Sequence, residues 1–580
     1  MSLRTADGRI LVVFDTDEKA ISHCYIKLYE PLYVRYRTQG VLIRTEPNRP
    51  HRILCRSARA PQPVTPWIVP VTPPNFVNPE ATQGPRLVTP TQRIQLRLSL
   101  IATAALVPLF VLSSAAVSQN GTAPPYNQTF VTKHTAVFGG ERVAYTATVA
   151  PTILTDSTGA PTVNFVSTSY VRDDVGDPKN RPVIFGLAGG PSNASNAYHT
   201  RFLGPKRIMD PVPGHEAEGP RLVDNPSGIL DVADVVLVDP AETGFSRILP
   251  AGKQSYFYSV NGDVASIEQF IGAWLKSHGR ESSPRYVMGG SYGSVRSIRI
   301  AWELQRAGRP LDGIIMTGNS SMLQEMNGPL AVAADLPTYT MTALYHGKID
   351  RAGRSDAEIA DEAYKFALRE YLGALTALQD LTPAERASWA AKLQARTGIS
   401  AEYFLAHDLA IPRQRFMAEL LKDKGLVLSN NNDGRVATPA NKPLSEEPDR
   451  NLELFRAYLR DELKVTYPVT EYASAAPNTR GWNYDGPPDA RRADGGNDWP
   501  RMLREVMEKD PNFRVYSANG YYDLTSAMGQ ALYLFSKTKL PRDRVVVHNN
   551  VGGHGLYADP PTAAAIAQDV RTMLAARRPR

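Results

Sequence analysis

The stretch GGSYG, residues 289–293, places Ser291 between glycines where an apolar run gives way to a helical pattern. Gly-x-Ser-x-Gly between a strand and a helix is typical of a nucleophile elbow, a very tight turn that presents the serine hydroxyl. Glycines on both sides avoid clashes with the neighbouring strand and helix. An ordinary glycine-serine loop would have the same pattern, so catalysis requires partners elsewhere in the chain.

Two later segments supply the partners that a serine nucleophile needs. Asp523 lies just beyond the apolar run 513–519, and His554 lies among glycines just beyond the apolar run 544–550. A serine hydroxyl attacks well only when an imidazole takes its proton, and a carboxylate orients and stabilises that imidazole. The order serine, acid, histidine is that of α/β hydrolases. We therefore predict Ser291, Asp523 and His554 as a catalytic triad, although a turn aspartate and an exposed loop histidine would explain either partner alone.

Negative charge develops on the substrate's carbonyl oxygen during such an attack, so hydrogen-bond donors must lie close to the serine. The segment GLAGGPSNAS, residues 186–195, follows an apolar run and offers unobstructed backbone N–H groups, that of Gly190 above all. The second donor would be the N–H of Tyr292, the residue after the serine. Gly189 and Gly290 adjoin these positions and are predicted to contact the substrate. A simple β-turn would also suit Gly-Gly-Pro.

Taken together and in order, these segments resemble the serine carboxypeptidase family, and most of all its bacterial branch without disulfides. The matching segments are Gly189-Gly190-Pro191 with Ser195, LGP at 203–205, LVDPAETGFSR at 237–247, GGSYGS at 289–294, NGYYD at 519–523 and GGHGLY at 552–557. The resemblance runs from about residue 130 to residue 575 and implies an α/β-hydrolase fold with a cap. It also implies the triad and the two oxyanion donors named above.

The chain departs from this family where the family recognises the terminal carboxylate of its substrate. Carboxypeptidases of the family use an Asn before Gly-Gly-Pro, a Glu before the nucleophile and often another Glu before Leu-Gly-Pro. Those positions hold Ala188, Gly290 and Phe202, which cannot hold a carboxylate. A site that loses its hydrogen-bonding partners loses the selectivity that they supplied. Glu242 also replaces a residue that is usually small, either as a surface charge or as a new substrate contact.

Short apolar runs alternating with helical patterns predict the elements that position these residues. Continuous runs of this length suit strands buried on both faces of a parallel sheet, so we predict a doubly wound, mostly parallel α/β sheet. In 262–278, apolar residues recur at spacings of three and four, which predicts a helix with Asp263 placed to cap it. The strand runs lie at 182–187, 233–239, 285–290, 312–318, 513–519 and 544–550.

The alternation of strand and helix patterns is interrupted between residues 323 and 510. Helical stretches such as 356–379 and 449–465 take over, mixed with polar loops. We interpret 323–510 as a helical cap inserted between two parts of one α/β-hydrolase core, residues 119–322 and 511–580.

The composition is that of an ordinary soluble globular protein, with 42% hydrophobic and 21% charged residues in a chain of 580. The net charge of +7 is concentrated in residues 1–92, which carry 12 Lys and Arg against 7 Asp and Glu. The remainder is close to neutral and has no basic stripe interleaved with aromatics, which argues against nucleic acid as a partner. Both cysteines, Cys24 and Cys55, lie in the same segment, and the histidines form no metal-binding motif. We expect no metal and no cofactor.

Residues 96–117 form the one strongly apolar stretch, which follows Arg93, carries no charge after Arg97 and is closed by small residues. This order is typical of a secretory signal peptide, although the length would also allow a membrane anchor. We predict a signal peptide within 93–118 and therefore a secreted or periplasmic protein. Contact with a membrane is expected only if the segment stays uncleaved.

The segment before it, residues 1–92, is basic, irregular and too rich in proline to pack a core. One hypothesis is that the native chain starts downstream, near Leu87 or Val88, so that the earlier residues are not part of the protein. The other is a disordered tail close to the membrane.

The sequence thus predicts a secreted serine hydrolase that cleaves a peptide, amide or ester bond through an acyl-enzyme. The family resemblance favours peptides cut from the C-terminus, whereas the lost carboxylate partners favour an esterase, an amidase or an acyltransferase. A hypothesis of another class is a catalytically silent binding protein on a hydrolase scaffold. The sequence carries no signal for the oligomeric state.

Overall fold

The computed structural model describes residues 125–210, 218–321, 327–430, 432–441, 449–486, 488–491 and 496–576, and six short strands near the N-terminus. Residues 1–116 and 117–580 are two separate compact units. In the first unit, β1 to β4 pair in that order as an antiparallel sheet, and β5 pairs with β6. These strands are β1 (Ser2–Ala6), β2 (Arg9–Val13), β3 (Cys24–Ile26), β4 (Val34–Arg35), β5 (Val41–Leu42) and β6 (Arg56–Ser57).

The predicted signal peptide at 93–118 lies outside the described residues, as does most of the segment 1–92. Within the described ranges, no helix is long and apolar enough to cross a bilayer.

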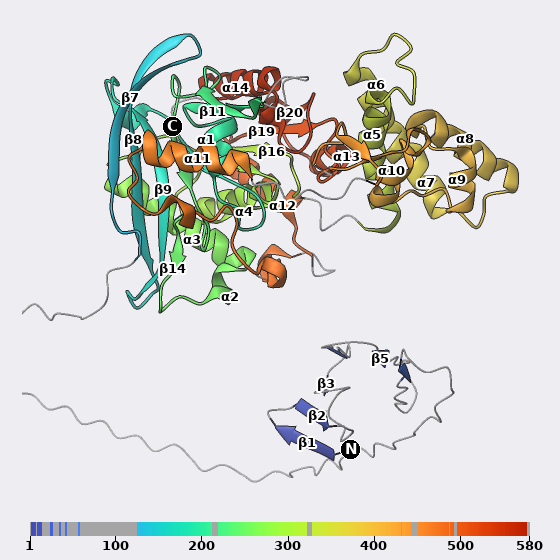
Figure 1. The fold of residues 1–580 in the computed structure, drawn as a ribbon, viewed down its shortest axis with the longest axis horizontal. Coiled ribbons are helices and arrows are strands. Elements are labelled where there is room, and N and C mark those ends of the chain that lie inside the picture. Colours follow the sequence, from blue (N-terminus) through green and yellow to red (C-terminus); the bar gives the residue numbers. More distant parts are fainter. Residues whose placement is uncertain are drawn as a thin grey trace, which may run out of the picture. The chain divides into compact units, whose positions relative to one another are not determined.

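The second unit is built on one ten-stranded sheet (Figure 1). Its order is β20-β19-β16-β15-β10-β13-β9-β8-β7, with β14 paired to β9. The first six of these strands pair in parallel, and β9, β8 and β7 extend the sheet with antiparallel pairs. The strands are β7 (Phe130–Phe138), β8 (Glu141–Thr155), β9 (Pro161–Arg172), β10 (Val183–Leu187), β13 (Asp234–Val238), β14 (Arg247–Ile248), β15 (Arg285–Gly290), β16 (Gly313–Thr317), β19 (Arg514–Gly520) and β20 (Val545–Asn550).

All six predicted strand runs are strands of this sheet, and the predicted mostly parallel α/β-hydrolase fold is confirmed. The antiparallel extension β7–β9 was not predicted. A separate hairpin joins β11 (Lys206–Met209) to β12 (Arg221–Asp224).

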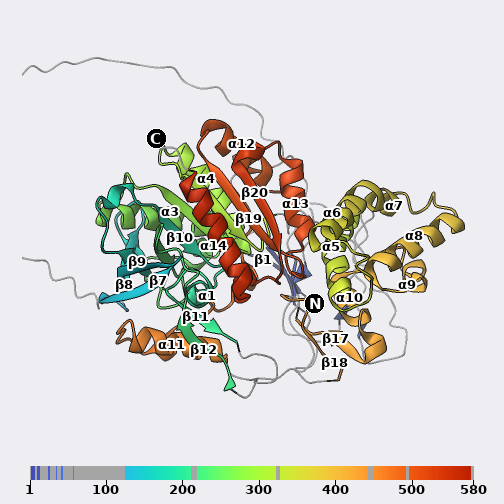
Figure 2. The same ribbon diagram turned by 90° about the horizontal axis from the view of Figure 1, so that it is seen from above.

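Helices cover both faces of the sheet, because successive strand residues point to opposite sides. In β10, Val183 and Phe185 belong to one core cluster together with α3, α4 and α12, whereas Ile184 belongs to the other cluster together with α14 (Figure 2). The helices around the sheet are α1 (Asn196–Arg201), α2 (Gln254–Phe257), α3 (Val260–Ser277), α4 (Tyr292–Arg306), α11 (Arg450–Asp461), α12 (Trp499–Lys509), α13 (Met528–Lys537) and α14 (Pro560–Ala575).

Helix α3 begins earlier than the sequence predicted, and the predicted cap was wrong. Ser259 caps the helix, since its hydroxyl accepts the N–H of Gly262 at 3.0 Å. Asp263 lies one turn inside the helix, where it is buried and paired with Arg296. An acidic residue that reads as a cap is therefore a core residue in this fold.

A helical group with its own hydrophobic core follows β16 and lies on the opposite side of this unit from β7 and β8 (Figures 1 and 2). Its first helix, α5, packs against α13 of the core. Within the range predicted as a cap, α11 and α12 do not join this group but pack their apolar faces against the sheet. The group comprises α5 (Gly328–Tyr345), α6 (Asp356–Phe366), a π-helical turn (Ala367–Tyr371), α7 (Leu372–Thr376), α8 (Pro383–Thr397), α9 (Ala401–Ala406), α10 (Arg413–Glu419) and the hairpin β17 (Leu426–Leu428) and β18 (Ala437–Pro439).

Candidate active site

Ser291 forms the sharp turn between β15 and α4. The strand ends at Gly290 and the helix begins at Tyr292, so the serine alone makes the connection. Its backbone has φ of +54° and ψ of −127°, a strained conformation that residues with a side chain rarely adopt. The turn is fixed by the N–H of Ser291, which donates to the carbonyl of Thr317 at 2.9 Å. Strain on a serine at a strand-to-helix turn is the geometry of a nucleophile elbow.

Glycines surround Ser291 because the backbone passes too close for any side chain. A Cβ at Gly289 would lie 1.9 Å from the carbonyl oxygen of Gly293, and a Cβ at Gly293 would lie 2.6 Å from that of Leu187. On the facing loop, a Cβ at Gly189 would lie 2.6 Å from the Cβ of Ser291. The glycines of the sequence motif therefore allow two loops and a helix to meet around one serine.

Asp523 and His554 meet beyond the ends of β19 and β20. Asp523 is fully buried, and its Oδ1 accepts the backbone N–H groups of Thr525 at 2.9 Å and Ser526 at 2.8 Å. Its Oδ2 lies 2.8 Å from Nδ1 of His554. A carboxylate that accepts from Nδ1–H leaves Nε2 of the imidazole as a proton acceptor, which is the tautomer that a general base requires.

The surroundings of His554 shift its pKa in two opposite directions. Burial lowers the pKa, but the charge of Asp523 and the hydrogen bond to it outweigh burial, so the pKa is raised above its ordinary value of 6.5. The imidazole packs on Gly318, where a Cβ would lie 3.0 Å from Nδ1. His554 is therefore held as a base strengthened by a buried carboxylate.

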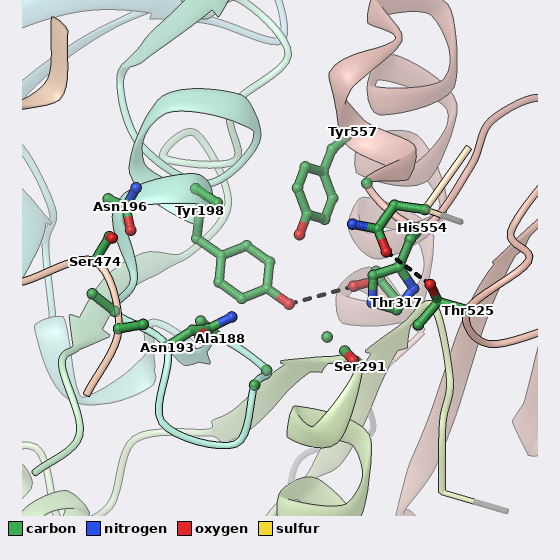
Figure 3. A pocket seen from close by; sticks show the side chains of 18 residues that line it. Ala188, Asn193, Asn196, Tyr198, Ser291, Thr317, Ser474, Thr525, His554 and Tyr557 are labelled. Atoms are coloured by element: carbon green, nitrogen blue, oxygen red, sulfur yellow. Dashed lines mark hydrogen bonds between the residues drawn. The ribbon is translucent and has the colours of Figure 1, made fainter. Parts of the chain in front are cut away.

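Ser291 and His554 border the same cavity, which has a volume of about 540 Å³. Figure 3 shows both side chains pointing toward this space, together with Tyr198 and Tyr557. No hydrogen bond between the Ser291 hydroxyl and the imidazole is present among the described residues; the bond that is formed joins His554 to Asp523. Catalytic hydrogen bonds are often long without substrate and tighten when it binds.

The two predicted oxyanion donors are the backbone N–H groups of Gly190 and Tyr292. Gly190 lines the cavity. Tyr292 is the first residue of α4, and an N–H in the first turn of a helix has no partner within that helix. Gly190 thus lies at the cavity and Tyr292 directly follows the serine, and their role as donors stays a prediction.

A buried arginine ties the oxyanion loop to the helix behind Ser291. Arg296 of α4 donates from Nη1 to the carbonyl of Ala188 at 2.6 Å. It also donates from Nε and Nη2 to the two carboxylate oxygens of Asp263 at 2.7 and 3.1 Å. The arginine is fully buried, and the Tyr292 hydroxyl donates to the same carboxylate at 3.1 Å. The ion pair therefore fixes α3, α4 and the loop relative to one another.

A model of the serine carboxypeptidase family matches residues 169–391, from β9 to α8. The protein is a serine hydrolase, similar over these residues to the serine carboxypeptidases. The predicted resemblance is therefore confirmed. The matched range includes Ser291 and Gly190 but ends before Asp523 and His554, so those two residues are placed by the geometry above.

Beyond the family model, the similarity to known proteins is to solved structures of low sequence identity. No curated protein sequence matches this chain. Kex1Δp, a prohormone-processing carboxypeptidase from Saccharomyces cerevisiae, is 12% identical with a TM-score of 0.46, covering 74% of this chain and 91% of its own. A proline iminopeptidase from Mycobacterium smegmatis is 16% identical with a TM-score of 0.31, covering 77% and 99%. The esterase RhEst1 from Rhodococcus sp. ECU1013 is 13% identical with a TM-score of 0.31, covering 74% and 99%.

The position that holds Glu in the carboxypeptidases is blocked in this chain by a tyrosine. A Cβ at Gly290 would lie 2.5 Å from the hydroxyl of Tyr198 and 3.0 Å from Oγ1 of Thr317. These two hydroxyl groups are themselves hydrogen-bonded at 3.3 Å (Figure 3). Tyr198 and a side chain at position 290 therefore compete for the same space.

The other two altered positions are also occupied by apolar groups. Phe202 is buried and stacks on Tyr557, with ring centroids 5.9 Å apart. Ala188 is buried and lines the cavity, with its carbonyl bound to Arg296. The carboxylate-binding residues of the family are thus replaced by packed aromatic and small side chains.

The cavity is polar but carries no fixed charge. Among the residues that the structure describes, its lining includes no Asp, Glu, Lys or Arg. Burial raises the pKa of Tyr198 well above its ordinary value of 10 and raises that of Tyr557 to about 12, so both hydroxyl groups stay neutral donors. Apart from Ser291 and His554, the remaining polar side chains are amides and hydroxyls: Asn193, Asn196, Thr317, Asn432, Ser474 and Thr525.

Two predicted substrate contacts lie at the cavity and one does not. Gly189 and Gly290 line it. Glu242 adopts a positive φ of 64° in the turn after β13, and its Oε1 accepts the N–H of Ile248 at 2.7 Å. It is absent from the cavity lining that the structure describes, so its carboxylate serves the turn.

Sequence reasoning missed Tyr198, Tyr557 and Asn432. Tyr198 lies between the Gly-Gly-Pro and Leu-Gly-Pro segments, and Tyr557 ends the segment GGHGLY, so proximity to matching motifs was an available signal. Asn432 is one of three consecutive asparagines in a polar loop and gave no such signal. In the described part of the chain, no group of His, Cys, Asp or Glu is arranged to hold a metal ion.

Proposed function

We propose that the protein hydrolyses ester or amide bonds through an acyl-enzyme on Ser291, and that the substrate carries no free carboxylate beside the scissile bond. The observation that carries this proposal is the uncharged cavity, in which the Tyr198 hydroxyl occupies the space of a side chain at position 290. A free carboxylate entering this space would lose its hydration and would meet no Lys or Arg side chain among the described lining residues. A neutral ester or amide would meet hydroxyl and amide partners.

The proposed mechanism uses the predicted triad and the two predicted oxyanion donors in turn. The hydroxyl of Ser291 attacks the carbonyl carbon while Nε2 of His554 takes its proton, and Asp523 stabilises the resulting imidazolium. The N–H groups of Gly190 and Tyr292 bind the oxyanion. His554 then protonates the leaving group, and a water activated by the same imidazole releases the acyl group.

The family match favours a second candidate, removal of a C-terminal residue from peptides. Under this alternative, neutral donors such as Tyr198 would bind the terminal carboxylate in place of the family's acidic pair. The two candidates differ in the response to a substrate whose only change is the charge beside the scissile bond.

The first experiment tests whether the site is catalytic at all. We expect a fluorophosphonate probe to label the folded protein, and labelling to vanish in Ser291→Ala. Folded wild-type protein that stays unlabelled would favour the silent binding protein over any hydrolase.

The second experiment distinguishes the substrates. A blocked dipeptide with a free C-terminus is compared with its C-terminal amide and with a simple aryl ester of the same acyl group. We expect kcat/KM for the amide and the ester to exceed that for the free acid. A clear preference for the free acid would replace the proposal by the carboxypeptidase alternative.

A further inference from the structure

Asn432 lies between β17 and β18, in the helical group that is inserted after β16. It completes a closed ring of hydrogen bonds that includes Asp523 and His554. The backbone carbonyl of Asn432 accepts the N–H of His554 at 2.5 Å. Its side-chain Oδ1 accepts the hydroxyl of Thr525 at 2.8 Å. Thr525 in turn donates its N–H to Asp523 at 2.9 Å, and Asp523 bonds His554 at 2.8 Å. We call Asn432, Thr525, Asp523 and His554 the acid–histidine ring.

The loop of Asn432 fits tightly against the loops that carry the acid and the histidine. A Cβ at Gly553 would lie 2.2 Å from the carbonyl oxygen of Asn432 and 2.7 Å from the Cβ of Asp433. Gly434 donates its N–H to the carbonyl of Tyr522 at 2.8 Å, next to Asp523. Residues 432–434 thus pack against Tyr522, which precedes Asp523, and against Gly553, which precedes His554. In the sequence, Asn432 lies 93 positions before Thr525.

The backbone and the side chain of Asn432 bind different partners. The carbonyl fixes the backbone of His554, while the side chain fixes Thr525, whose N–H orients the carboxylate that orients the imidazole. A displacement of about 1 Å at a catalytic group can lower the rate on the order of 100-fold, so restraints of this kind affect the chemical step. The ring has both catalytic candidates among its members, and the cavity borders three of the four residues.

We propose that Asn432 is a positioning residue for the Asp523–His554 pair, so that the insertion supplies part of the catalytic machinery rather than only a wall of the pocket. This proposal rests on the proposed function. Asn432 acts through Thr525 and through the backbone of His554. It therefore affects the turnover number more than the binding of substrate.

The experiment is a double-mutant cycle of Asn432→Ala and Thr525→Val, assayed with the neutral aryl ester and the fluorophosphonate probe. Both substitutions remove one end of the same hydrogen bond, and Thr525→Ser keeps the hydroxyl as the matched control. We expect each single variant to lower kcat and the labelling rate about tenfold with KM nearly unchanged. The double variant should be no slower than the slower single variant, because the shared interaction is lost only once.

Several results would overturn the proposal. Multiplicative effects in the double variant would show that the two residues act independently. A raised KM with unchanged kcat would assign Asn432 to substrate binding. A lowered melting temperature with unchanged kcat in the folded fraction would assign it to stability of the insertion. A Thr525→Ser variant close to the wild type supports the role of the hydroxyl, whereas a loss equal to that of Thr525→Val contradicts it.

A second control separates the ring from the loop around it. Arg435 binds both carboxylate oxygens of Asp433 in the same loop and lies over the ring of Tyr522, and its described hydrogen bonds include none to the four residues of the acid–histidine ring. We expect Arg435→Gln to leave kcat within about twofold even if it lowers the melting temperature by several degrees. If the wild type itself reacts with the probe while all variants match it, only the positioning proposal fails; if the wild type does not react, the proposed function fails.

Discussion

The two sides of the cavity are held in place by different kinds of interaction. On the nucleophile side, Ser291 lies between a buried strand and a buried helix, and the buried Arg296–Asp263 pair links that helix to the oxyanion loop. On the other side, the acid–histidine ring lies on loops beyond the strand ends and includes Asn432 from the insertion. The first side is part of the core, whereas the second is an assembly of hydrogen bonds between distant segments.

We therefore expect substitutions on the nucleophile side to change mainly the free energy of unfolding, and substitutions on the other side to change mainly the reaction rate. Substitutions on the nucleophile side are expected to unfold or distort the core, because close-packed backbone and a desolvated ion pair tolerate little change. Substitutions in the acid–histidine ring are expected to slow the reaction while the sheet stays folded. Paired measurements of rate and unfolding free energy can therefore test the comparison directly.

The largest expected effect on rate comes from Asp523→Asn. The substitution nearly preserves shape but removes the charge that fixes the His554 tautomer, so we expect kcat to fall on the order of 10⁴-fold. The wild-type kcat/KM should fall tenfold per pH unit below a pKa that lies above 6.5, because His554 must be neutral to act as a base. Without the charge of Asp523 that pKa falls, so the acid limb moves to lower pH. A pH profile of kcat/KM measures both.

Thermal unfolding is the control for this variant. Because Asn retains a hydrogen-bonding oxygen for Thr525 and Ser526, we expect a stability change of only about 1 kcal/mol. An acid limb that stays in place would contradict the assignment of Asp523 as the partner of His554.

The largest expected effect on stability comes from Arg296→Met. It leaves the buried carboxylate of Asp263 without its cation, which costs about 3–5 kcal/mol of unfolding free energy. Urea unfolding at neutral pH measures this loss. The rate should also fall, because the carbonyl of Ala188 loses its donor next to the oxyanion loop.

The double variant Arg296→Met with Asp263→Leu distinguishes the two effects. Removing both charges should restore most of the stability, since an apolar pair of similar volume avoids the unpaired buried charge. The rate should stay low, because the carbonyl of Ala188 still lacks the hydrogen-bond donor that Arg296 provided. Recovery of both properties together would show that Arg296 contributes to the rate only through stability.

The nucleophile side could be predicted from the sequence because its information is local. GGSYG encodes the turn, because a Cβ at Gly289 or Gly293 would collide with backbone and a Cβ at Gly290 would collide with the Tyr198 hydroxyl. The six parallel strands were equally clear, since strands buried on both faces appear as continuous apolar runs. Local patterns that directly reflect backbone contacts are therefore recovered well.

The antiparallel extension and the acid–histidine ring were not predicted, for separate physical reasons. In β7 the inward positions include Thr132 and His134, whereas Val131 and Val137 are exposed, so no alternation of apolar residues marks the strand. Asn432 belongs to a polar loop whose composition resembles any surface loop. Its role depends on contact with His554, which only the folded chain brings near.

A smaller effect on stability is expected from adding one methyl group at the tight turn around Ser291. In Gly289→Ala the new Cβ would lie 1.9 Å from the carbonyl of Gly293, so the helix must move away from the strand, at a cost of about 3 kcal/mol. Gly555→Ala is the matched control, because it lies at the cavity with nothing within 4 Å of its Cβ. Unfolding and labelling measured on both should show a loss only in the first. Equal losses in both variants would mean that contact at the turn is not the cause.

The smallest expected effect concerns the hydroxyl of Tyr198. Tyr198→Phe removes one neutral hydrogen bond of 3.3 Å to Thr317, so we expect kcat/KM for the neutral ester to change by about 1 kcal/mol or less, within about fivefold. The sharper readout is the tolerance of position 290. In the wild type, Gly290→Ala brings its Cβ to 2.5 Å from that hydroxyl and should lower both stability and rate.

In the Tyr198→Phe background the contact at 2.5 Å is gone, and the new Cβ of Gly290→Ala meets the edge of the ring at 3.4 Å and Oγ1 of Thr317 at 3.0 Å. The cost of the added methyl should therefore shrink, and the two substitutions should be less harmful together than the sum of their separate effects. A cost that is equal in both backgrounds would show that something other than this hydroxyl keeps position 290 free of a side chain. The absence of the family's glutamate would then have to be explained by Thr317, whose Oγ1 lies 3.0 Å from the same point.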